Sequence, residues 1–569
     1  MASEIFEETL NLEIGLLEAG PATADSYPYP SLAPVGRSEP RAFRAVILEN
    51  PYLRATFVPA LGGRLLSLFD KRSQVEVLHE GPLVPMPGGR RGASLPSGIC
   101  LHLDGADRLT SMASVQYAAE EPDEETPAAL WLAEAVTGTG LSWHLHVVLP
   151  PDRAELRIEA RVFNRTWEDV PYRAGLLLPV FGENRSDGTA FFTLQDGRGV
   201  GLIPERGGWS AGVAGGALVL ARFPEMRGLA PRQLDTWAVS IIPVSGLGHI
   251  DAISRYGALA IEGDRLRLQA VEPLRMHKII LLTRSGQTME APLLAFPEEI
   301  VEMSLPEPVD GVALLDAHKD ELLRWEGEWL EIGRETPPAA PCLRPSLRSE
   351  DLEDATFDVA TRHAAHALLG NRALAAGDLA EAEYRYEQAL LYNAEDHLTW
   401  WMKAIAKREG GHEGGEVAEM LNAHYLAPLD PILRAESFFR QPRPAGKEPA
   451  VLLRPMDEHP ENYVEVAALL VEAQLFELAG RWIDEALRHL DLPMLRYLLA
   501  YAHIKATGMD FEAAEQVAVA GRMPLAPPFP WRQTEIEAIF RLAERFPGDG
   551  RLHELTLLLL DFRALAESK

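Results

Sequence analysis

Histidines and carboxylates that lie two residues apart on predicted strands are the first residues that could do chemistry. His102 and Asp104 have this spacing, so a regular strand would point both side chains to the same face. An imidazole and a carboxylate that face one cleft can serve as general acid and general base. A solvated strand end can carry the same pair without a chemical role, and the spacing allows both arrangements.

Two further histidines and one glutamate extend this set. His144 and His146 alternate with apolar residues in the segment 143–147, so both are expected on one side of a strand. There they either line a ligand site or make hydrogen bonds within the sheet. Glu272 and His277 flank a four-residue turn, where either could supply an acid or a base.

The composition limits the partners of the chain. Its 569 residues predict more than one domain, and its formal net charge of −30 disfavours nucleic acid and anionic membranes, which would repel the average surface. Cys100 and Cys342 form no CxxC or Cys/His cluster, so we expect no disulfide framework, no metal and no cofactor. The acidic N-terminus lacks a secretion signal, and no uncharged apolar run approaches the roughly 18 residues of a membrane span. We therefore expect a cytoplasmic protein.

The chain from residue 41 to residue 305 is predicted to form an antiparallel β structure. Short runs of β-branched and aromatic residues are separated by Gly, Pro, Asn and Asp, without helical segments between them. In the run 155–162 the apolar residues share one face and the charged residues share the other. A large sandwich accommodates so many strands most simply. Residues 1–40 are expected to form a lead-in segment.

The composition changes after the β part. Residues 306–354 carry two groups of prolines around a short helix that is predicted near 317–330, so this part is expected to be a connector. From residue 355 to residue 569 the chain is rich in Ala, Leu and Glu at helical spacing. The second half is therefore predicted to be all-α.

The first helical pair of this half has a recognisable pattern. Gly370, Ala382 and Tyr386 reproduce the spacing of small and large residues in a tetratricopeptide repeat, a helix-turn-helix unit of about 34 residues. Weaker copies follow, with generic helical packing as the alternative. Repeats of this kind stack into a curved surface, so we expect a protein partner to bind the helical part.

The most specific stretch of the sequence is Val46–Arg72, which contains Pro-Ala-Leu-Gly-Gly-Arg followed by Ser-Leu-Phe-Asp-Lys. This stretch resembles the opening of the galactose-mutarotase-like sandwiches. Arg161–Thr166 is similar to a strand end of domain-of-unknown-function family 5107, a bacterial group in which such a sandwich precedes tetratricopeptide repeats. The resemblance implies a multidomain β + α fold class: an N-terminal antiparallel β-(super)sandwich of galactose-mutarotase type and a C-terminal all-α tetratricopeptide-like solenoid.

The chain departs from the family pattern at two positions. Family members carry a Gly-Ile-Glu-Phe-Asn strand before a His-His pair, and the corresponding stretch here is Gly98–Asp104, with Cys100 in place of the glutamate. Arg267 stands where the family pattern implies a second acid. Two active-site carboxylates are therefore missing, unless Asp104, Asp107 or Glu272 has taken over their task.

The resemblance implies a carbohydrate ligand, and candidate site residues follow from it and from the spacing. The aromatic residues that could stack on a sugar are Trp131, Trp143, Trp167, Trp209 and Trp237, most of which are expected in the core. The predicted catalytic residues are His102, Asp104, Glu272 and His277, and the predicted ligand-binding residues are Arg64, Trp143, His144, His146 and Arg267.

Three functions remain open at this level. The first is a carbohydrate-binding protein with a degenerate mutarotase-like site, coupled to a repeat scaffold. The second is a carbohydrate-active enzyme, either an aldose epimerase or a glycoside hydrolase, which would use His and carboxylate acid–base chemistry. The third is a protein-interaction scaffold without a small-molecule ligand. Fold alone does not choose among them.

Overall fold

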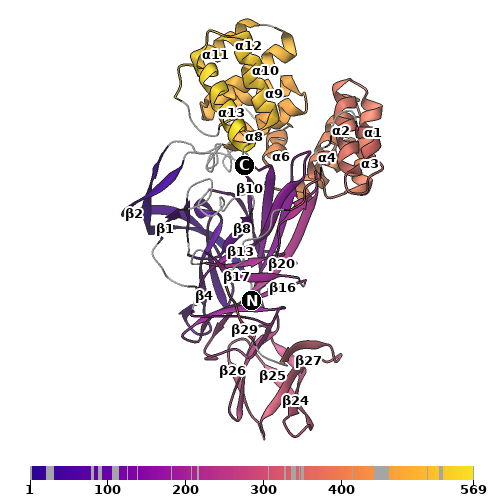
Figure 1. Ribbon diagram of the computed structural model, residues 1–569. Helices are drawn as coiled ribbons and strands as arrows, with labels where there is room; N and C mark the ends of the chain where they lie inside the picture. The colour runs from indigo at the N-terminus through magenta and orange to yellow at the C-terminus, as the bar shows by residue number, and fades with distance from the viewer. Residues whose placement is uncertain are drawn as a thin grey trace.

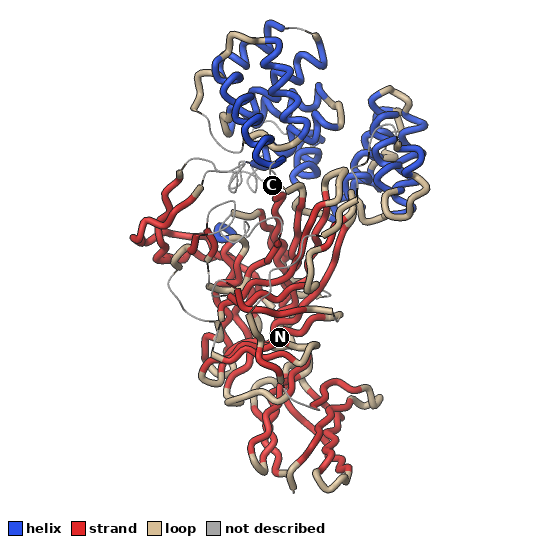
Figure 2. Tube along the Cα trace, viewed as in Figure 1, coloured by secondary structure: helices blue, strands red, loops and turns tan. Residues whose placement is uncertain are grey.

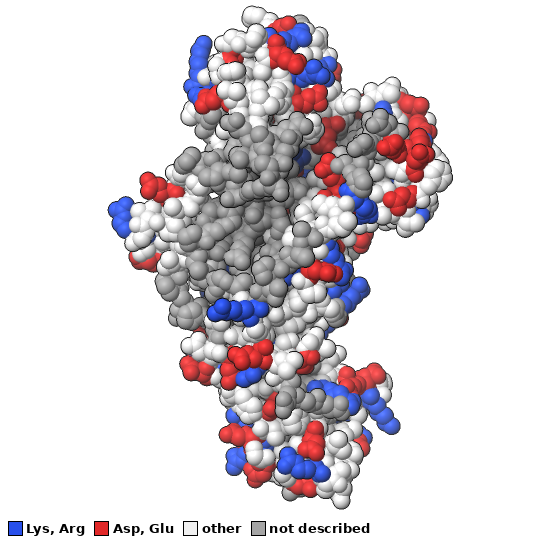
Figure 3. Space-filling view, viewed as in Figure 1, with Lys and Arg blue, Asp and Glu red and all other residues white. Residues whose placement is uncertain are grey.

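The computed structural model shows a β part followed by an α part, which confirms the predicted fold class (Figure 1, Figure 2). Positive and negative side chains are interspersed over the face shown in Figure 3, so the net charge of −30 is not gathered into one patch of that face. The structure describes residues 3–20, 31–78, 83–87, 93–95, 97–104, 114–124, 126–136, 139–180, 182–206, 208–214, 217–305, 307–325, 329–334, 341–344, 347, 351–412, 414–440, 461–508, 510–524 and 529–567.

Three antiparallel sheets build the sandwich within the described residues. The five-stranded N-terminal sheet has the order β1 (Glu4–Ala19), β2 (Leu32–Glu49), β3 (Leu53–Val58), β4 (Arg64–Asp70) and β5 (Val75–Glu76), and the short helix η1 (Pro59–Leu61) joins β3 to β4. The nine-stranded sheet has the order β29 (Leu330–Glu331), β14 (Glu183–Ser186), β15 (Phe191–Gln195), β16 (Arg198–Pro204), β20 (Leu234–Ser245), β12 (Leu156–Asn164), β11 (Leu141–Leu149), β10 (Ala128–Val136) and β9 (Gln116–Glu120). The third sheet contains β17 (Ser210–Ala214), β18 (Ala217–Ala221), β13 (Val170–Pro179), β19 (Arg227–Leu229) and β8 (Cys100–Asp104).

The sandwich core lies between the nine-stranded sheet and the third sheet. On β12, Leu156, Ile158 and Ala160 point into this core, and the charged residues between them point outward, as the alternation predicted. Leu101 on β8 and Leu176 on β13 meet them from the opposite sheet. The nine-stranded sheet therefore has one apolar face and one polar outer face.

A smaller β body follows the sandwich in the chain and lies at the other end from the helices (Figure 1). It has a core of its own between two sheets. One sheet contains β21 (Ala252–Ser254), β22 (Gly257–Glu262), β23 (Arg265–Ala270) and β26 (Ile300–Ser304). The other contains β25 (Thr288–Ala295), β24 (Leu274–Thr283), β27 (Val309–Leu315) and β28 (Glu321–Trp325). Outside this body, β6 (Met86–Pro87) and β7 (Ala93–Ser94) form a separate two-stranded sheet.

Two sequence-based expectations need correction here. The expected lead-in at residues 1–40 contains β1, whose even-numbered apolar residues pack against a second core of the N-terminal sheet. The helix predicted near 317–330 is wrong, because β27 and β28 form a hairpin there. Its turn is made by Asp316, which accepts hydrogen bonds from the backbone of His318 and Asp320, and by Lys319 at φ 71°.

The α part consists of helical hairpins. Within the described residues its helices are α1 (Leu352–Ala355), α2 (Arg362–Ala375), α3 (Leu379–Tyr392), α4 (His397–Glu409), α5 (Val417–Leu426), α6 (Pro431–Arg440), α8 (Glu461–Glu472), α9 (Phe476–His489), α10 (Pro493–Thr507), α11 (Asp510–Ala520), α12 (Gln533–Arg545) and α13 (Gly550–Glu567). None of them is long and apolar enough to cross a membrane.

The first hairpin packs as the repeat pattern predicted. A Cβ atom at Gly370 of α2 would lie 2.6 Å from the ring of Tyr386 on α3, so only glycine permits this approach of the two helices. The Tyr386 hydroxyl donates to Asn371 at 2.9 Å, and Ala382 is fully buried beside it. Sequence and structure agree closely at this hairpin.

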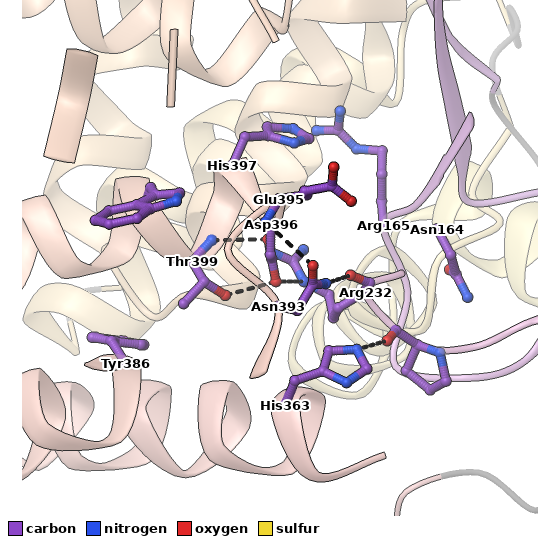
Figure 4. A network of polar contacts seen from close by, with 12 residues as sticks. Asn164, Arg165, Arg232, His363, Tyr386, Asn393, Glu395, Asp396, His397 and Thr399 are labelled. Carbon is purple, nitrogen blue, oxygen red and sulfur yellow. Dashed lines mark hydrogen bonds and ion pairs between the residues drawn. The ribbon is translucent and has the colours of Figure 1, made fainter. Parts of the chain in front are cut away.

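Two buried ion pairs fasten the α part to the end of the sandwich, and Figure 4 shows the first of them, between Arg232 and Asp396. Arg232, in the loop before β20, donates through Nη2 and Nε to the two oxygens of Asp396 at 2.5 and 3.0 Å. Asp396 also caps α4 by accepting a hydrogen bond from the backbone of Thr399. Its burial raises the pKa, but Arg232 and Thr399 reverse this effect and hold the pKa of Asp396 below its usual value.

The second pair joins Arg165, just after β12, to Asp430 at 2.5 Å. Asp430 precedes α6 and accepts a hydrogen bond from the backbone of Ile432, so it also satisfies the start of a helix. His397 contributes a third contact to the same carboxylate at 3.0 Å. Burial disfavours the charge of Asp430, but Arg165 and His397 outweigh this and hold its pKa well below the usual range.

We predict that Asp396→Asn lowers the free energy of unfolding of the helical part by about 3 to 5 kcal/mol, because it leaves Arg232 buried without a counter-ion while the helix cap is kept. Denaturant titration followed by the helical circular-dichroism signal measures this loss. Arg324→Met, in the exposed pair with Glu321, is the control and should change stability by less than about 1 kcal/mol. Equal effects of the two variants would contradict a fastening role for Arg232 and Asp396.

Candidate functional site between sandwich and repeats

A cavity of about 380 Å³ lies between the outer face of the nine-stranded sheet and the helical part. It opens where β16 stops following β20: the last contact between them is Glu205 N to Ala238 O, after the pair Pro204 and Val239. We call this space the interdomain cavity. Its lining residues are Arg157, Glu159, Ala160, Arg161, Glu205, Arg206, Trp209, Arg222, Leu234, Thr236, Trp237, Ala238, Glu395, Tyr425 and Leu426.

Two tryptophans supply the aromatic part of the lining. Trp209 and Trp237 meet edge to face, with ring centroids 5.2 Å apart and an interplanar angle of 84°. Both residues are largely buried and belong to the apolar core of the sandwich, where Trp237 lies opposite Ala160 of β12, so the cavity reaches the edge of this core. Paired aromatic rings of this kind offer an apolar contact surface to a small ligand.

Arginine and glutamate side chains form the polar part of the lining. Arg157 on β12 donates to Glu205 at 2.7 Å and also pairs with Glu159. The hydrogen bond from Arg157 lowers the pKa of Glu205, so this carboxylate is ionised and can accept hydrogen bonds at neutral pH. The rim of the cavity thus combines fixed donors with fixed acceptors.

The helical part closes one side of the cavity. Arg161 on β12 donates through Nη1 to the backbone oxygen of Leu426 at the end of α5, at 2.8 Å. Tyr425 precedes this contact, and Glu395 adjoins Asp396 in the loop before α4. The helical part thus contributes Glu395, Tyr425 and Leu426 to the lining, and the other lining residues belong to the sandwich.

The predicted residues Arg64, His102 and Asp104 lie away from this cavity, in and near β8. The buried Arg64 donates to the backbone oxygen of Ser97 and lies beside Cys100; burial raises the pKa of this thiol, and Arg64 opposes the rise. His102 is buried opposite Gly175 of β13, on the face away from the sandwich core. The backbone of Asp104 pairs with Arg173, and its side chain lies outside the described residues.

Glu272, His277 and Arg267 belong to the smaller β body. Glu272 is paired with Arg153, and His277 is exposed, with Nδ1 2.7 Å from the backbone oxygen of Arg275. Arg267 pairs with Glu302 at 3.2 Å. The four predicted catalytic residues are thus divided between two bodies, because His102 and Asp104 lie in the third sheet of the sandwich.

The segment 143–146 is divided between the two faces of the nine-stranded sheet. Trp143 is fully buried in the core, so its predicted stacking on a ligand is wrong. His146 and His144 do share the outer face, as predicted. His146 stacks on Trp131 with ring centroids 4.2 Å apart, and its Nε2 lies 3.4 Å from Glu120. These contacts hold His146 against the sheet.

His144 is covered by the helical part. Its Nε2 is buried without a hydrogen-bond partner among the described residues, as are the amide of Gln116 and the hydroxyl of Ser142 on the same face. Burial, followed by the nearby His397, lowers the pKa of His144 to about 3, although Asp430 opposes this. A buried polar atom without a hydrogen-bond partner lowers the stability of the fold, so burial of the His144 Nε2 is destabilising.

The cavity contains residues that sequence reasoning did not single out. Trp209 and Trp237 were among five candidate aromatic residues, but nothing in their spacing distinguished them from core residues. Glu205, Glu395 and Tyr425 were missed because they come from three distant segments that meet only in the folded chain. Within the described part of the chain, no group of three His, Cys, Asp or Glu residues could hold a metal ion.

The fold and the cavity define a class of protein: a β-sandwich whose outer sheet face is covered by helical repeats, with a cavity where the two parts meet. Residues 21–174 match the family described as Domain of unknown function (DUF5107). The predicted resemblance is therefore confirmed, with the matched segment running from the N-terminal sheet to β13.

Solved structures of several other proteins are similar to the chain. A TPR-domain containing protein from Parabacteroides distasonis is 12% identical over 96% of each chain, with a TM-score of 0.37. A galactose mutarotase-like protein from Lactobacillus casei is 13% identical over 49% of this chain and 98% of its own, with a TM-score of 0.20. A 4-alpha-glucanotransferase from Thermococcus litoralis is 14% identical over 35% of this chain and 37% of its own, with a TM-score of 0.24. These are distant similarities, and the conclusions below rest on contacts within this chain.

We predict that His144→Leu weakens the pH dependence of stability. The folded pKa of about 3 lies below the usual value near 6.5, so the unfolded chain binds a proton that the folded chain excludes, and stability falls as the pH drops below about 6.5. At pH 5 this contribution is about 2 kcal/mol, and the leucine variant should lack it.

Denaturant midpoints at pH 7.5 and pH 5 measure the difference between wild type and variant. His318→Leu, in the exposed turn between β27 and β28, is the control and should retain the wild-type pH dependence. If His144→Leu and His318→Leu respond to pH alike, His144 is not held neutral by the docked repeats.

Proposed function

We propose that this chain is a carbohydrate-binding protein that holds its ligand in the interdomain cavity. The observation that carries the proposal is the edge-to-face pair of Trp209 and Trp237 within a lining that also presents arginine and glutamate side chains. Sugars have apolar ring faces and hydroxyl edges, so they match aromatic surfaces bordered by fixed donors and acceptors. The cavity volume of about 380 Å³ falls within the usual range of about 300 to 1,000 Å³ for small-molecule sites.

The helical part supplies the scaffold half of this proposal. A second groove of about 710 Å³ runs between the first hairpins and the helices α8 and α9. Phe439 and Phe476 give it apolar surface, and Arg408 and Arg481 give it charge. Mixed apolar and charged surfaces of this kind suit a protein partner, so ligand binding and partner binding would share the helical part.

We expect sugar binding to raise the melting temperature of the protein by mass action, and a thermal-shift screen of neutral and charged sugars tests this. Arg157→Gln should weaken the affinity of a sugar identified in this way about 10-fold or more, because it removes a charged hydrogen-bond donor from the cavity. Arg324→Gln, on the smaller β body, is the matched control and should leave affinity unchanged. If no sugar of the panel raises the melting temperature at millimolar concentrations, the protein-interaction scaffold is left as the function.

A second candidate function is acid–base catalysis on the bound sugar, and Asp235 favours it. Asp235 lies on β20 between the lining residues Leu234 and Thr236, although it is not itself part of the lining, and it shares a hydrogen bond with Tyr172. Its Oδ2 is buried without a hydrogen-bond partner among the described residues. Burial raises the pKa of Asp235, although Tyr172 and Arg222 oppose the rise, and a raised pKa helps a carboxyl group to keep the proton that a general acid needs.

On this second candidate, Asp235→Asn should abolish exchange of anomers or hydrolysis of a bound sugar while leaving its affinity within about threefold of wild type. Polarimetry and release of reducing ends measure the two reactions. Asp320→Asn, in an exposed turn of the smaller β body, is the control for the substitution. Wild-type protein that binds a sugar and changes neither its anomer nor its linkages would exclude catalysis and leave the binding function intact.

A further inference from the structure

The mouth of the interdomain cavity carries an aromatic residue that is separate from the buried tryptophan pair. Tyr425 on α5 lines the cavity, yet it is 77% exposed to solvent. Trp209 and Trp237 are 8% and 7% exposed. One lining thus runs from two enclosed aromatic rings to a third ring that lies open on the surface of the helical part.

The exposure of Tyr425 has no structural explanation within the fold. Among the described residues its side chain has no hydrogen-bond partner and no ring contact, and it belongs to none of the apolar cores. The neighbouring Leu426 is held by Arg161, so the backbone that carries Tyr425 is fixed relative to the sheet. An exposed aromatic ring on a fixed backbone at the mouth of a cavity can contact whatever part of a ligand extends beyond the cavity.

The charges of the lining indicate the class of ligand. Four arginines face three glutamates, and Arg157 is already paired with Glu159 and Glu205. Arg161 is engaged by the backbone of Leu426 and lies over the ring of Trp131. Two of the four arginines are therefore already engaged, and the lining has one more arginine than glutamates, so it lacks the concentrated positive charge that would favour an anionic sugar.

We infer that the ligand is a neutral oligosaccharide whose terminal unit occupies the cavity and whose next unit stacks on Tyr425. This inference rests on the proposed function and adds to it the size and the charge of the ligand. Because the cavity is lined mostly by the sandwich and Tyr425 lies at its mouth on the helical part, a ligand that reaches Tyr425 contacts both parts of the chain at once. Binding of a chain longer than one sugar would then favour the docked arrangement of the two parts.

Isothermal titration of the full chain tests the inference with glucose, galactose and mannose and with maltotetraose, cellotetraose and mannotetraose as probes. Tyr425→Ala should lower the affinity for the tetrasaccharide that binds by about 3- to 10-fold. It should leave the affinity for the corresponding monosaccharide within about twofold of wild type. Tyr425→Phe should retain the wild-type affinity, because stacking needs the ring and not the hydroxyl. Leu421→Ala, an exposed residue one turn earlier on α5, is the matched control and should change neither affinity.

Three outcomes would overturn the inference in different ways. If Tyr425→Ala and wild type bind the tetrasaccharide with equal affinity, Tyr425 forms no second subsite, and the proposed function in the cavity is unaffected. Tighter binding of tetragalacturonate than of every neutral tetrasaccharide would reverse the assignment of charge. Absence of binding to all of these sugars would reject the proposed function, and the inference with it.

Discussion

The arrangement of the whole molecule depends on two carboxylates that each have two tasks. Asp396 and Asp430 satisfy the exposed backbone at the starts of α4 and α6, and the same carboxylates neutralise Arg232 and Arg165 at the end of the sandwich. A capping aspartate is already ordered by its helix, so little further side-chain entropy is lost when the arginine binds it. The helical part is therefore held at the first turns of α4 and α6, where the same carboxylates also fix the helix backbone.

This mode of docking determines what the outer face of the nine-stranded sheet can do. Where helices press on the sheet, His144 is buried and neutral, and Trp131 packs against Leu429. Where β16 turns away from β20, the helices cannot reach the sheet and the interdomain cavity remains. In the proposed function, the ligand and the attached repeats use one surface, so a bound sugar would influence the helical part through that surface.

Much of the fold could be predicted because its signals are local. The alternation of residues 155–162 required one buried face, and the pairing of Gly370 with Tyr386 required two closely packed helices. The hairpin of β27 and β28 was mistaken for a helix because its charged turn sits between two prolines, and residues 1–40 were underestimated because β1 is only half buried. Both errors concern edge elements, in which the apolar pattern is weakest.

The sequence by itself determined the order of a β part and an α part, the inward face of the strands, the hairpin packing of the repeats and the family resemblance. These follow from periodicity and from residues that lie close together in the chain. Only the tertiary structure decided that Trp143 is core, that His144 is covered, and that Trp237, Glu205 and Tyr425 line one cavity. The reason is physical: a strand pattern shows that residues share a face, but the segments that cover that face lie as far as 265 residues away in the chain. Their docking depends on ion pairs that no local pattern encodes.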